Sequence, residues 1–154
     1  MRKIPKKNYL IMFIIVVLVA LITIILTNIY NNSYKTTSTM YNYLSEIKKN
    51  DLDTYLIEKP NIILYIADKY DLSNNYIEAK LQKEIIKYNA KDYFVYLNIN
   101  ENNIEFIDNL NKKYNGSISK QLPVLVVIEE GQIIKTYYNL ENINLKELTG
   151  DMKW

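Results

Sequence analysis

"SKQLPVLVVIEEGQIIKTYYN", residues 119–139, combines a proline, two apolar runs and a two-residue turn. Pro123 opens the run PVLVVI, whose length and composition fit a strand buried on both faces. Glu130 and Gly131 then form a pair typical of a tight turn, and QIIKTYY supplies the partner strand. Because proline has no N–H for a sheet ladder, the start of a strand is a natural place for it. The stretch therefore predicts a β-hairpin entered through Pro123.

Strand and helix patterns alternate before this hairpin. NIILYIAD at 61–68 and DYFVYLNI at 92–99 have the length and composition of buried strands. A short helix at 50–59, ended by Pro60, is predicted before the first strand. Apolar residues at helical spacing follow each strand, namely Ile77, Leu81, Ile85 and Tyr88, and then Ile104, Ile107, Leu110 and Tyr114. A last helix is expected over 141–150.

This order of elements predicts the fold class. Two strands joined through a helix are expected to be parallel, whereas the final hairpin is antiparallel. The expected architecture is therefore an α/β domain with a mixed sheet and helices on both faces. We place this domain at residues 43–154. Residues 31–42, which are polar and rich in turn formers, are expected to be a linker, although Met40, Leu44 and Ile47 also fit the start of a helix.

The N-terminal 30 residues differ in character from the rest. A basic segment, 1–8, precedes an uncharged apolar run at 9–30. A run of ~20 apolar residues is long enough to cross a bilayer as a helix. A soluble domain of this size rarely buries a helix that is apolar on every face, and a cleaved signal peptide would have a shorter apolar region and a small-residue cleavage site. We therefore predict an uncleaved transmembrane helix that contacts membrane lipid through residues 9–30.

Charge predicts the orientation of this helix. Four cations precede the apolar run, and only Lys35 lies in the near flank that follows it. The positive-inside rule then keeps the N-terminus in the cytoplasm and places the C-terminal domain outside the cell membrane, as a single-pass protein. All 17 acidic residues but only 15 of the 19 basic residues follow the run, so that part carries a charge of −2. This balance argues against nucleic acid as a partner.

The chain contains no cysteine and no histidine. Disulfides, thiolate nucleophiles and the usual zinc ligands are therefore excluded, as is the usual general base near neutral pH. Asn98, Asn100 and Asn102 alternate as in a calcium loop, but the required glycine and glutamate are missing. The carboxylate pairs Glu129/Glu130 and Asp51/Asp53 have no partner nucleophile. We accordingly predict no catalytic residue, no metal, no cofactor and no enzymatic activity.

Three segments together resemble the thioredoxin fold: NIILYIADKYDLSNN (61–75), FVYLNIN (94–100) and LPVLVVIEEGQIIKTY (122–137). In that family the first buried strand ends in alanine or glycine, a C-x-x-C pair caps the next helix, and a cis-proline begins a later hairpin strand. Leu122-Pro123 matches the proline position. The resemblance covers residues 43–154. With the single N-terminal span, the YIAD segment most resembles a Gram-positive branch described as bacteriocin-transport accessory proteins.

The family's redox pair has no counterpart in this chain. It would fall within KYDLSNN (69–75), at Tyr70 and Ser73 or at Asp71 and Asn74, depending on register. Disulfide exchange requires a thiolate that attacks a disulfide sulfur, and neither pair of positions contains sulfur. The redox activity of the family is therefore not carried over.

A binding role is the function that remains. Six residues are candidates for a peptide-binding ledge, in which the backbone before the proline pairs with an extended peptide: Tyr70, Asp71, Ser73, Asn74, Leu122 and Pro123. Alternatively, Pro123 only shapes the strand entry and Ser73 only caps a helix. We expect a membrane-anchored, redox-inactive accessory module with a peptide or envelope protein as its partner, as in bacteriocin export. The alternative is a structural or immunity-like membrane protein whose span carries the function.

Overall fold

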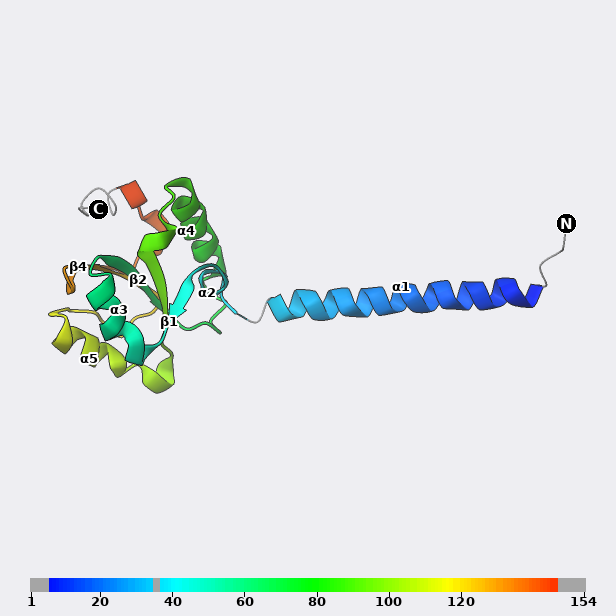
Figure 1. Cartoon of the computed structure of the whole chain (residues 1–154), viewed down its shortest axis with the longest axis horizontal. Coiled ribbons are helices and arrows are strands. Elements are labelled where there is room, and N and C mark those ends of the chain that lie inside the picture. The colour runs from blue at the N-terminus through cyan, green and yellow to red at the C-terminus, as the bar shows by residue number, and fades with distance from the viewer. Residues whose placement is uncertain (1–5, 35–36, 147–154) are drawn as a thin grey trace. The chain divides into compact units, whose positions relative to one another are not determined.

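The computed structural model describes residues 6–34 and 37–146 and divides the chain into two units, 1–36 and 37–154 (Figure 1). The first unit is helix α1 (Lys6–Tyr34), in which Asn8–Tyr30 is long and apolar enough to cross a membrane. Thr23 and Thr27 lie within this segment. Their hydroxyls donate to the carbonyl oxygens of Val19 (2.9 Å) and Thr23 (2.8 Å), so neither polar group lacks a partner in an apolar surrounding.

The second unit is built on a five-stranded mixed sheet in the order β1-β3-β2-β4-β5. β1, β2 and β3 are parallel where they pair, β4 runs antiparallel to β2, and β5 runs antiparallel to β4. The predicted α/β fold class is therefore confirmed. The strands are β1 (Ser45–Ile47), β2 (Ile62–Ala67), β3 (Phe94–Asn98), β4 (Val124–Glu129) and β5 (Gln132–Tyr137).

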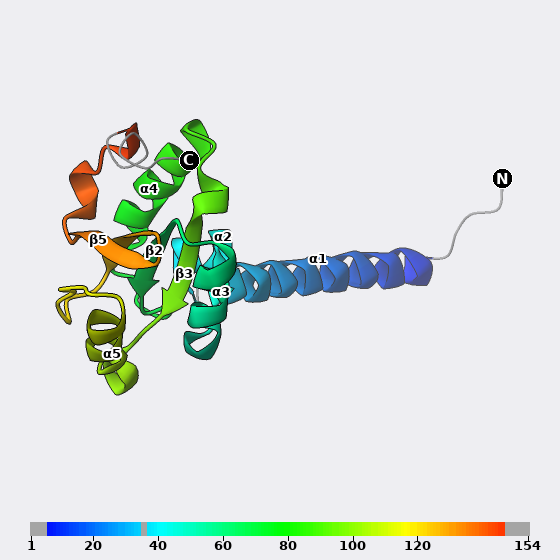
Figure 2. The ribbon, with the colours of Figure 1, turned by 60° about the vertical axis from the view of Figure 1, so that its left-hand side comes forward.

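Helices cover both faces of this sheet (Figure 2). α2 (Thr39–Tyr43) and α4 (Asn75–Lys87) pack on one face, and α3 (Leu52–Glu58) and α5 (Phe106–Lys113) pack on the other. Successive side chains of a strand point to opposite faces, so every residue of β2 is buried under one helical layer or the other. This arrangement explains the unbroken apolar run that begins at Ile62. Residues 37–146 also contain four single-turn helices: η1 (Lys49–Asp51), η2 (Lys91–Tyr93), η3 (Glu101–Asn103) and η4 (Leu140–Asn142).

The predicted hairpin is confirmed, but the start of the folded unit differs from the expected linker at 31–42. α1 extends to Tyr34, and α2 begins at Thr39, which agrees with the alternative that Met40 lies at the start of a helix. β1 escaped prediction because it has three residues, of which only Ile47 is buried. The folded unit thus begins at Thr37 and not at residue 43.

The predicted C-terminal helix over 141–150 also differs from the structure. η4 occupies 140–142, with the Asn139 side chain accepting a hydrogen bond from the Glu141 N–H (3.3 Å). Ile143 is then extended (φ −67°, ψ 123°), which ends this short helix. Helical backbone resumes at 145–146, and residues 147–150 of the predicted helix lie outside the described residues.

A buried glutamate fixes α2 to the rest of the unit. Glu78, on α4, is 1% exposed, and its carboxylate accepts hydrogen bonds from the Met40 N–H (2.9 Å) and the Tyr65 hydroxyl (2.8 Å). The first N–H groups of a helix have no partner within it, and a carboxylate at this end is electrostatically favourable. The pKa of Tyr65 lies far above its usual value, mainly because the side chain is buried and secondly because the Glu78 carboxylate is close. The Tyr65 hydroxyl therefore stays protonated and donates its hydrogen bond. Glu78 therefore joins helix α2, helix α4 and strand β2.

We expect Glu78→Ala to lower the free energy of unfolding by about 2–4 kcal/mol, because it leaves two buried donors without an acceptor at ~1–3 kcal/mol each. Urea denaturation of the full chain in detergent, followed by the near-UV circular dichroism of its tyrosines, measures this loss. Glu84→Ala on the same helix is the matched control, since the Glu84 carboxylate pairs with the exposed ammonium of Lys87 at 3.4 Å. The control is expected to change stability by about 0.5 kcal/mol or less. Equal losses in the two variants would contradict the assigned role of Glu78.

Candidate functional site

The sheet brings the two predicted halves of the site together at one end. β2 and β4 are antiparallel neighbours in which Ile66 pairs with Val124, so the end of β2 meets the start of β4. The loop 68–74 leaves the end of β2, and the Leu122-Pro123 peptide bond immediately before β4 is cis. The loop and the proline are therefore neighbours, as the thioredoxin resemblance implies.

Two grooves flank Leu122. The first, called here the apolar groove, has a volume of about 390 Å³ and lies between the start of α4 and the segment that follows β5. It is lined by Asn74, Ile77, Gln121, Leu122, Pro123, Tyr138, Asn139, Leu140 and Glu141. The second, called here the acidic groove, has a volume of about 540 Å³. It is lined by Asp68, Asp71, Asn100, Glu101, Asn102, Ile104, Lys120 and Leu122.

Two aspartates of the loop 68–74 accept hydrogen bonds from other residues of the same loop. Asp71 Oδ1 accepts from the Ser73 N–H (2.9 Å) and the Ser73 hydroxyl (2.6 Å), and Oδ2 accepts from the Asn74 side-chain amide (2.9 Å). Asp68 Oδ1 accepts from the Tyr70 N–H (2.9 Å) in the same way. Such bonds from an aspartate to groups two residues later are a standard way to stabilise a turn. The loop is therefore a closed hydrogen-bonded turn at the start of α4, with the Asp71 carboxylate shared among three donors.

The six predicted site residues divide into three groups. Asn74, Leu122 and Pro123 line the apolar groove, and Asp71 joins Leu122 in the acidic groove. Tyr70 and Ser73 line neither groove. The sequence pattern places the N-cap of α4 at Ser73 or Asn74, and the structure places it at Asn74, although no side chain makes a capping hydrogen bond there. Both side chains bond to Asp71 instead.

Several lining residues were not predicted from the sequence. Tyr138, Asn139 and Glu141 come from the segment after β5, and Lys120 comes from the loop before Leu122. Their positions relative to the loop 68–74 depend on the pairing of β2, β4 and β5, which no local motif encodes. Glu101 belongs to the asparagine-rich stretch 98–103, whose sequence pattern does not indicate a groove.

The other candidate polar clusters have structural partners. The Asn98 side chain accepts from the Lys69 N–H (3.1 Å), and Asn100 and Asn103 form a reciprocal capping box around η3. The sequence pattern also predicts a capping box two residues further on, at Asn102 and Glu105, but α5 begins there without a side-chain cap. Among the described residues, no group of three or more acidic side chains is placed to hold a metal ion.

Asp53 is not paired with Asp51 for catalysis. Its carboxylate accepts hydrogen bonds from the Lys113 ammonium and the Tyr114 hydroxyl, and so it joins α3 to the end of α5. The hydrogen bonds from Lys113 and Tyr114 lower the pKa of Asp53 below its usual value. Burial and the bond to Asp53 raise the pKa of Tyr114, so its hydroxyl remains a donor.

Comparisons with known proteins give structural neighbours only. No family model and no curated protein matches the chain. Thioredoxin f2 of Chlamydomonas reinhardtii is 14% identical with a TM-score of 0.47, covering 70% of this chain and 91% of its own. Mitochondrial thioredoxin 3 of Saccharomyces cerevisiae is also 14% identical, with a TM-score of 0.47, and the match covers 73% of this chain and 96% of that protein. Fasciola hepatica thioredoxin is 14% identical, with a TM-score of 0.44, and the match covers 70% of this chain and 94% of that protein.

We expect Asp71→Ala to open the turn before α4, because three donors lose their acceptor. The exposed position limits the loss to about 1 kcal/mol, and the fold is retained. Amide hydrogen exchange at Ser73 measures the effect and is expected to become faster. Asp71→Asn is the matched control, since it keeps an amide oxygen for Ser73 and gives a smaller change. Unchanged Ser73 exchange in Asp71→Ala would show that Asp71 does not stabilise the turn.

The stability contributed by Asp53 is expected to depend on pH. Because its pKa in the folded chain lies below the ordinary 3.8, its stabilising effect is present above that value and is lost as the pH falls through the folded pKa. The stability difference between the natural chain and Asp53→Asn should therefore be largest near neutral pH and shrink below pH 3.8. Urea denaturation across this range gives the difference, and a gap that widens on acidification would contradict the assignment.

Proposed function

We propose that this chain is a membrane-anchored module that binds an extended peptide and exchanges no electrons with it. The absence of cysteine supports the redox-inactive part of the proposal, because thiol–disulfide exchange needs a thiolate. α1, which has the length and composition of a membrane-spanning helix, supports the anchoring. The cations before α1 and the near-neutral flank after it favour a cytoplasmic N-terminus and a folded unit outside the cell membrane.

The proposed binding role rests mainly on the backbone groups of Leu122. Within the described part of the chain, no hydrogen bond involves the N–H or the C=O of Leu122, although this residue lies between the two grooves. Leu122 is half-buried, so its backbone N–H and C=O are open to a partner from outside, and an extended peptide that pairs with a strand supplies such a partner. The ledge at Leu122 therefore offers main-chain hydrogen bonds, which give affinity without selecting a particular sequence.

The two grooves then provide the side-chain selection. Alternate residues of an extended peptide point to opposite sides, so two grooves on either side of one ledge suit successive positions. Ile77, Leu122 and Leu140 make the apolar groove suitable for an aliphatic or aromatic side chain. The acidic groove has three carboxylates and one cation, Lys120, whose ammonium is already paired with Asp108 at 2.9 Å. We propose that it takes a basic side chain.

No step of bond making or breaking is assigned to this site. The Ser73 hydroxyl is the only alcohol in the loop 68–74, and the carboxylate beside it is shared with two further donors. A serine nucleophile is weak unless an adjacent general base activates it, and the chain contains no histidine for that role. The proposal is therefore recognition without turnover. The setting that we propose is the export of a secreted peptide, which rests on the sequence resemblance to bacteriocin-transport accessory proteins alone.

Site-specific photocrosslinking in the native membrane tests the ledge. A photoreactive benzoylphenylalanine at Gln121, in the apolar groove, and one at Asn102, in the acidic groove, are expected to capture the same peptide or protein. The matched control carries the probe at Ile57, which is 83% exposed on α3 and lines neither groove. Equal capture at all three positions, or capture at none, would reject the ledge as a binding site.

A truncation separates this proposal from the alternative in which the span carries the function. A chain that ends before the sheet, lacking residues 60–154, retains α1 but loses both grooves. We expect this truncation to abolish the biological effect of the chain. An effect that survives it would favour the structural or immunity-like role.

A further inference from the structure

Three exposed apolar residues lie in the short segment 70–76, which ends in the first turn of α4, and are called here the cluster. Tyr70, Leu72 and Tyr76 are 63%, 41% and 69% exposed. The other large apolar side chains described as exposed in this unit are scattered over α3, the end of α4, and β5. Single exposed apolar residues need no explanation, whereas a cluster of them marks a contact surface. Tyr70 lines neither groove, so the proposed peptide site does not account for it.

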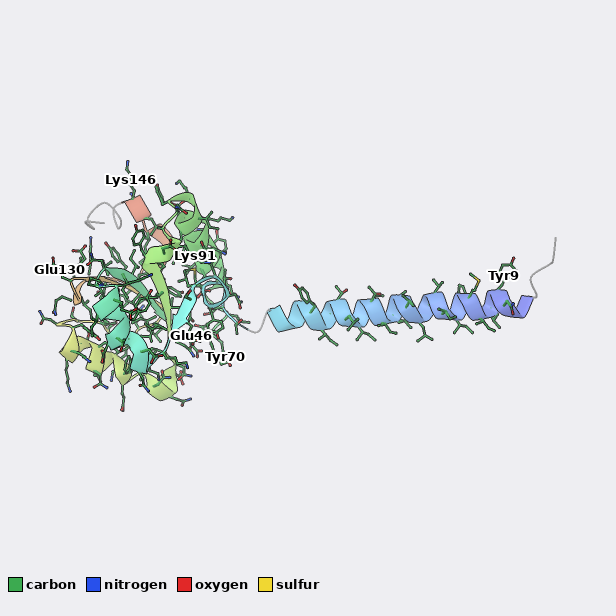
Figure 3. All side chains as sticks on the ribbon, viewed as in Figure 1. Tyr9, Glu46, Tyr70, Lys91, Glu130 and Lys146 are labelled. Carbon is green, nitrogen blue, oxygen red and sulfur yellow. The ribbon has the colours of Figure 1, made fainter. Side chains whose placement is uncertain are left out.

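Hydrogen bonds place this cluster beside the chain entry. The Ser38 N–H donates to the carbonyl oxygen of Lys69 (2.8 Å), and the Thr39 N–H donates to the Asn75 side chain (3.0 Å). Tyr70 and Tyr76 are the residues that directly follow these two acceptors. The cluster is thus held on both sides of the first residues of the folded unit, and Figure 3 shows the Tyr70 side chain on the surface of this unit.

Two lysines lie over the tyrosine rings of this surface, and tyrosine with lysine is a composition typical of the membrane interface. The Lys69 ammonium lies 5.0 Å from the ring centroid of Tyr41 and 5.2 Å from that of Tyr70, and the Lys80 ammonium lies 4.5 Å from that of Tyr76. Tyrosines are enriched at the level of the lipid headgroups, and lysines extend along apolar surface while keeping the charge in water. Asp68 and Asp71 offset the two lysines, so the surface is close to neutral and relies on its aromatic residues.

The length of chain between α1 and the folded unit indicates what contacts this surface. The apolar segment of α1 ends at Tyr30, and Ser38 follows eight residues later. A chain of this length spans at most about 28 Å even when fully extended. If α1 crosses a bilayer, the surface of that bilayer is always within reach of the cluster, whereas a soluble partner has no such constraint.

We infer that Tyr70, Leu72 and Tyr76 insert into the headgroup region of the bilayer that anchors the chain. The inference rests on the proposed membrane anchoring. The insertion holds the end of the sheet that carries the two grooves at the membrane surface. A peptide bound there is then one that emerges from, or lies on, the same membrane. Because the surface is nearly neutral, the insertion does not require anionic lipid.

Tryptophan fluorescence in vesicles tests this contact. Trp154 is the only tryptophan, so the full chain with Trp154→Phe is the background for single probes at Tyr70→Trp, Tyr76→Trp and the control Ile57→Trp. Interfacial side chains sit ~5–10 Å into the headgroup and acyl boundary, so a nitroxide on the phosphatidylcholine near the headgroup is the matching quencher. We expect about two-fold stronger quenching at positions 70 and 76 than at 57, with blue-shifted emission that persists in high salt.

The outcomes separate this inference from the proposed anchoring. Flotation of the same vesicles after an alkaline carbonate wash reports whether α1 is integral to the membrane, independently of the probes. A chain that does not float contradicts the anchoring itself. A chain that floats but shows equal quenching at positions 57, 70 and 76 overturns only the lipid contact. A blue shift that grows with the protein-to-lipid ratio and is insensitive to the quencher indicates a second copy on this surface and also overturns it. Urea denaturation verifies that each variant is folded. We expect all of them to fold, because positions 57, 70 and 76 are exposed.

Discussion

The complete burial of strand β2 is the constraint on which the folded unit depends. All six of its residues are buried, and side chains on opposite faces require separate apolar partners. Ile63, Tyr65 and Ala67 pack under α2 and α4, while the residues between them pack under α3 and α5. A strand with two apolar faces forces a three-layer arrangement, because either face left open would expose a continuous apolar surface to water.

The buried layer between the sheet and helices α2 and α4 contains polar groups, and these need hydrogen-bond partners within the layer. Tyr65 brings a hydroxyl into the core, and Glu78 supplies its acceptor while capping α2 through the Met40 N–H. A buried polar group without a partner is costly, so these groups fix one arrangement of the layer. The same contacts determine where the chain that leaves α1 joins the sheet, close to the loop 68–74. The core, the chain entry and the candidate site are in this way parts of one hydrogen-bonded region.

The geometry of the candidate site follows from strand pairing and not from the residues of its loop. The end of β2, the loop 68–74 and Pro123 are adjacent because β2 and β4 are paired, whatever residues the loop contains. In this chain the loop contains an aspartate that satisfies its neighbours, and no sulfur. The backbone of Leu122 lies between the two grooves, and this is the feature on which the proposed recognition rests.

The sequence by itself determined the apolar helix, the buried strands and the hairpin, because each has a local signal. Such signals are the unbroken apolar runs of β2 and β4 and the Glu130-Gly131 turn, in which both residues have positive φ. It also determined that disulfide exchange is excluded, since that follows from composition alone. The tertiary structure alone decided on β1, α2 and the lining of the grooves. β1 has a single buried residue, and α2 is held by Asn75 and Glu78 from a distant part of the chain. Tyr138 and Lys120 reach the site only through strand pairing, and such long-range contacts leave no periodic pattern in the sequence around either residue.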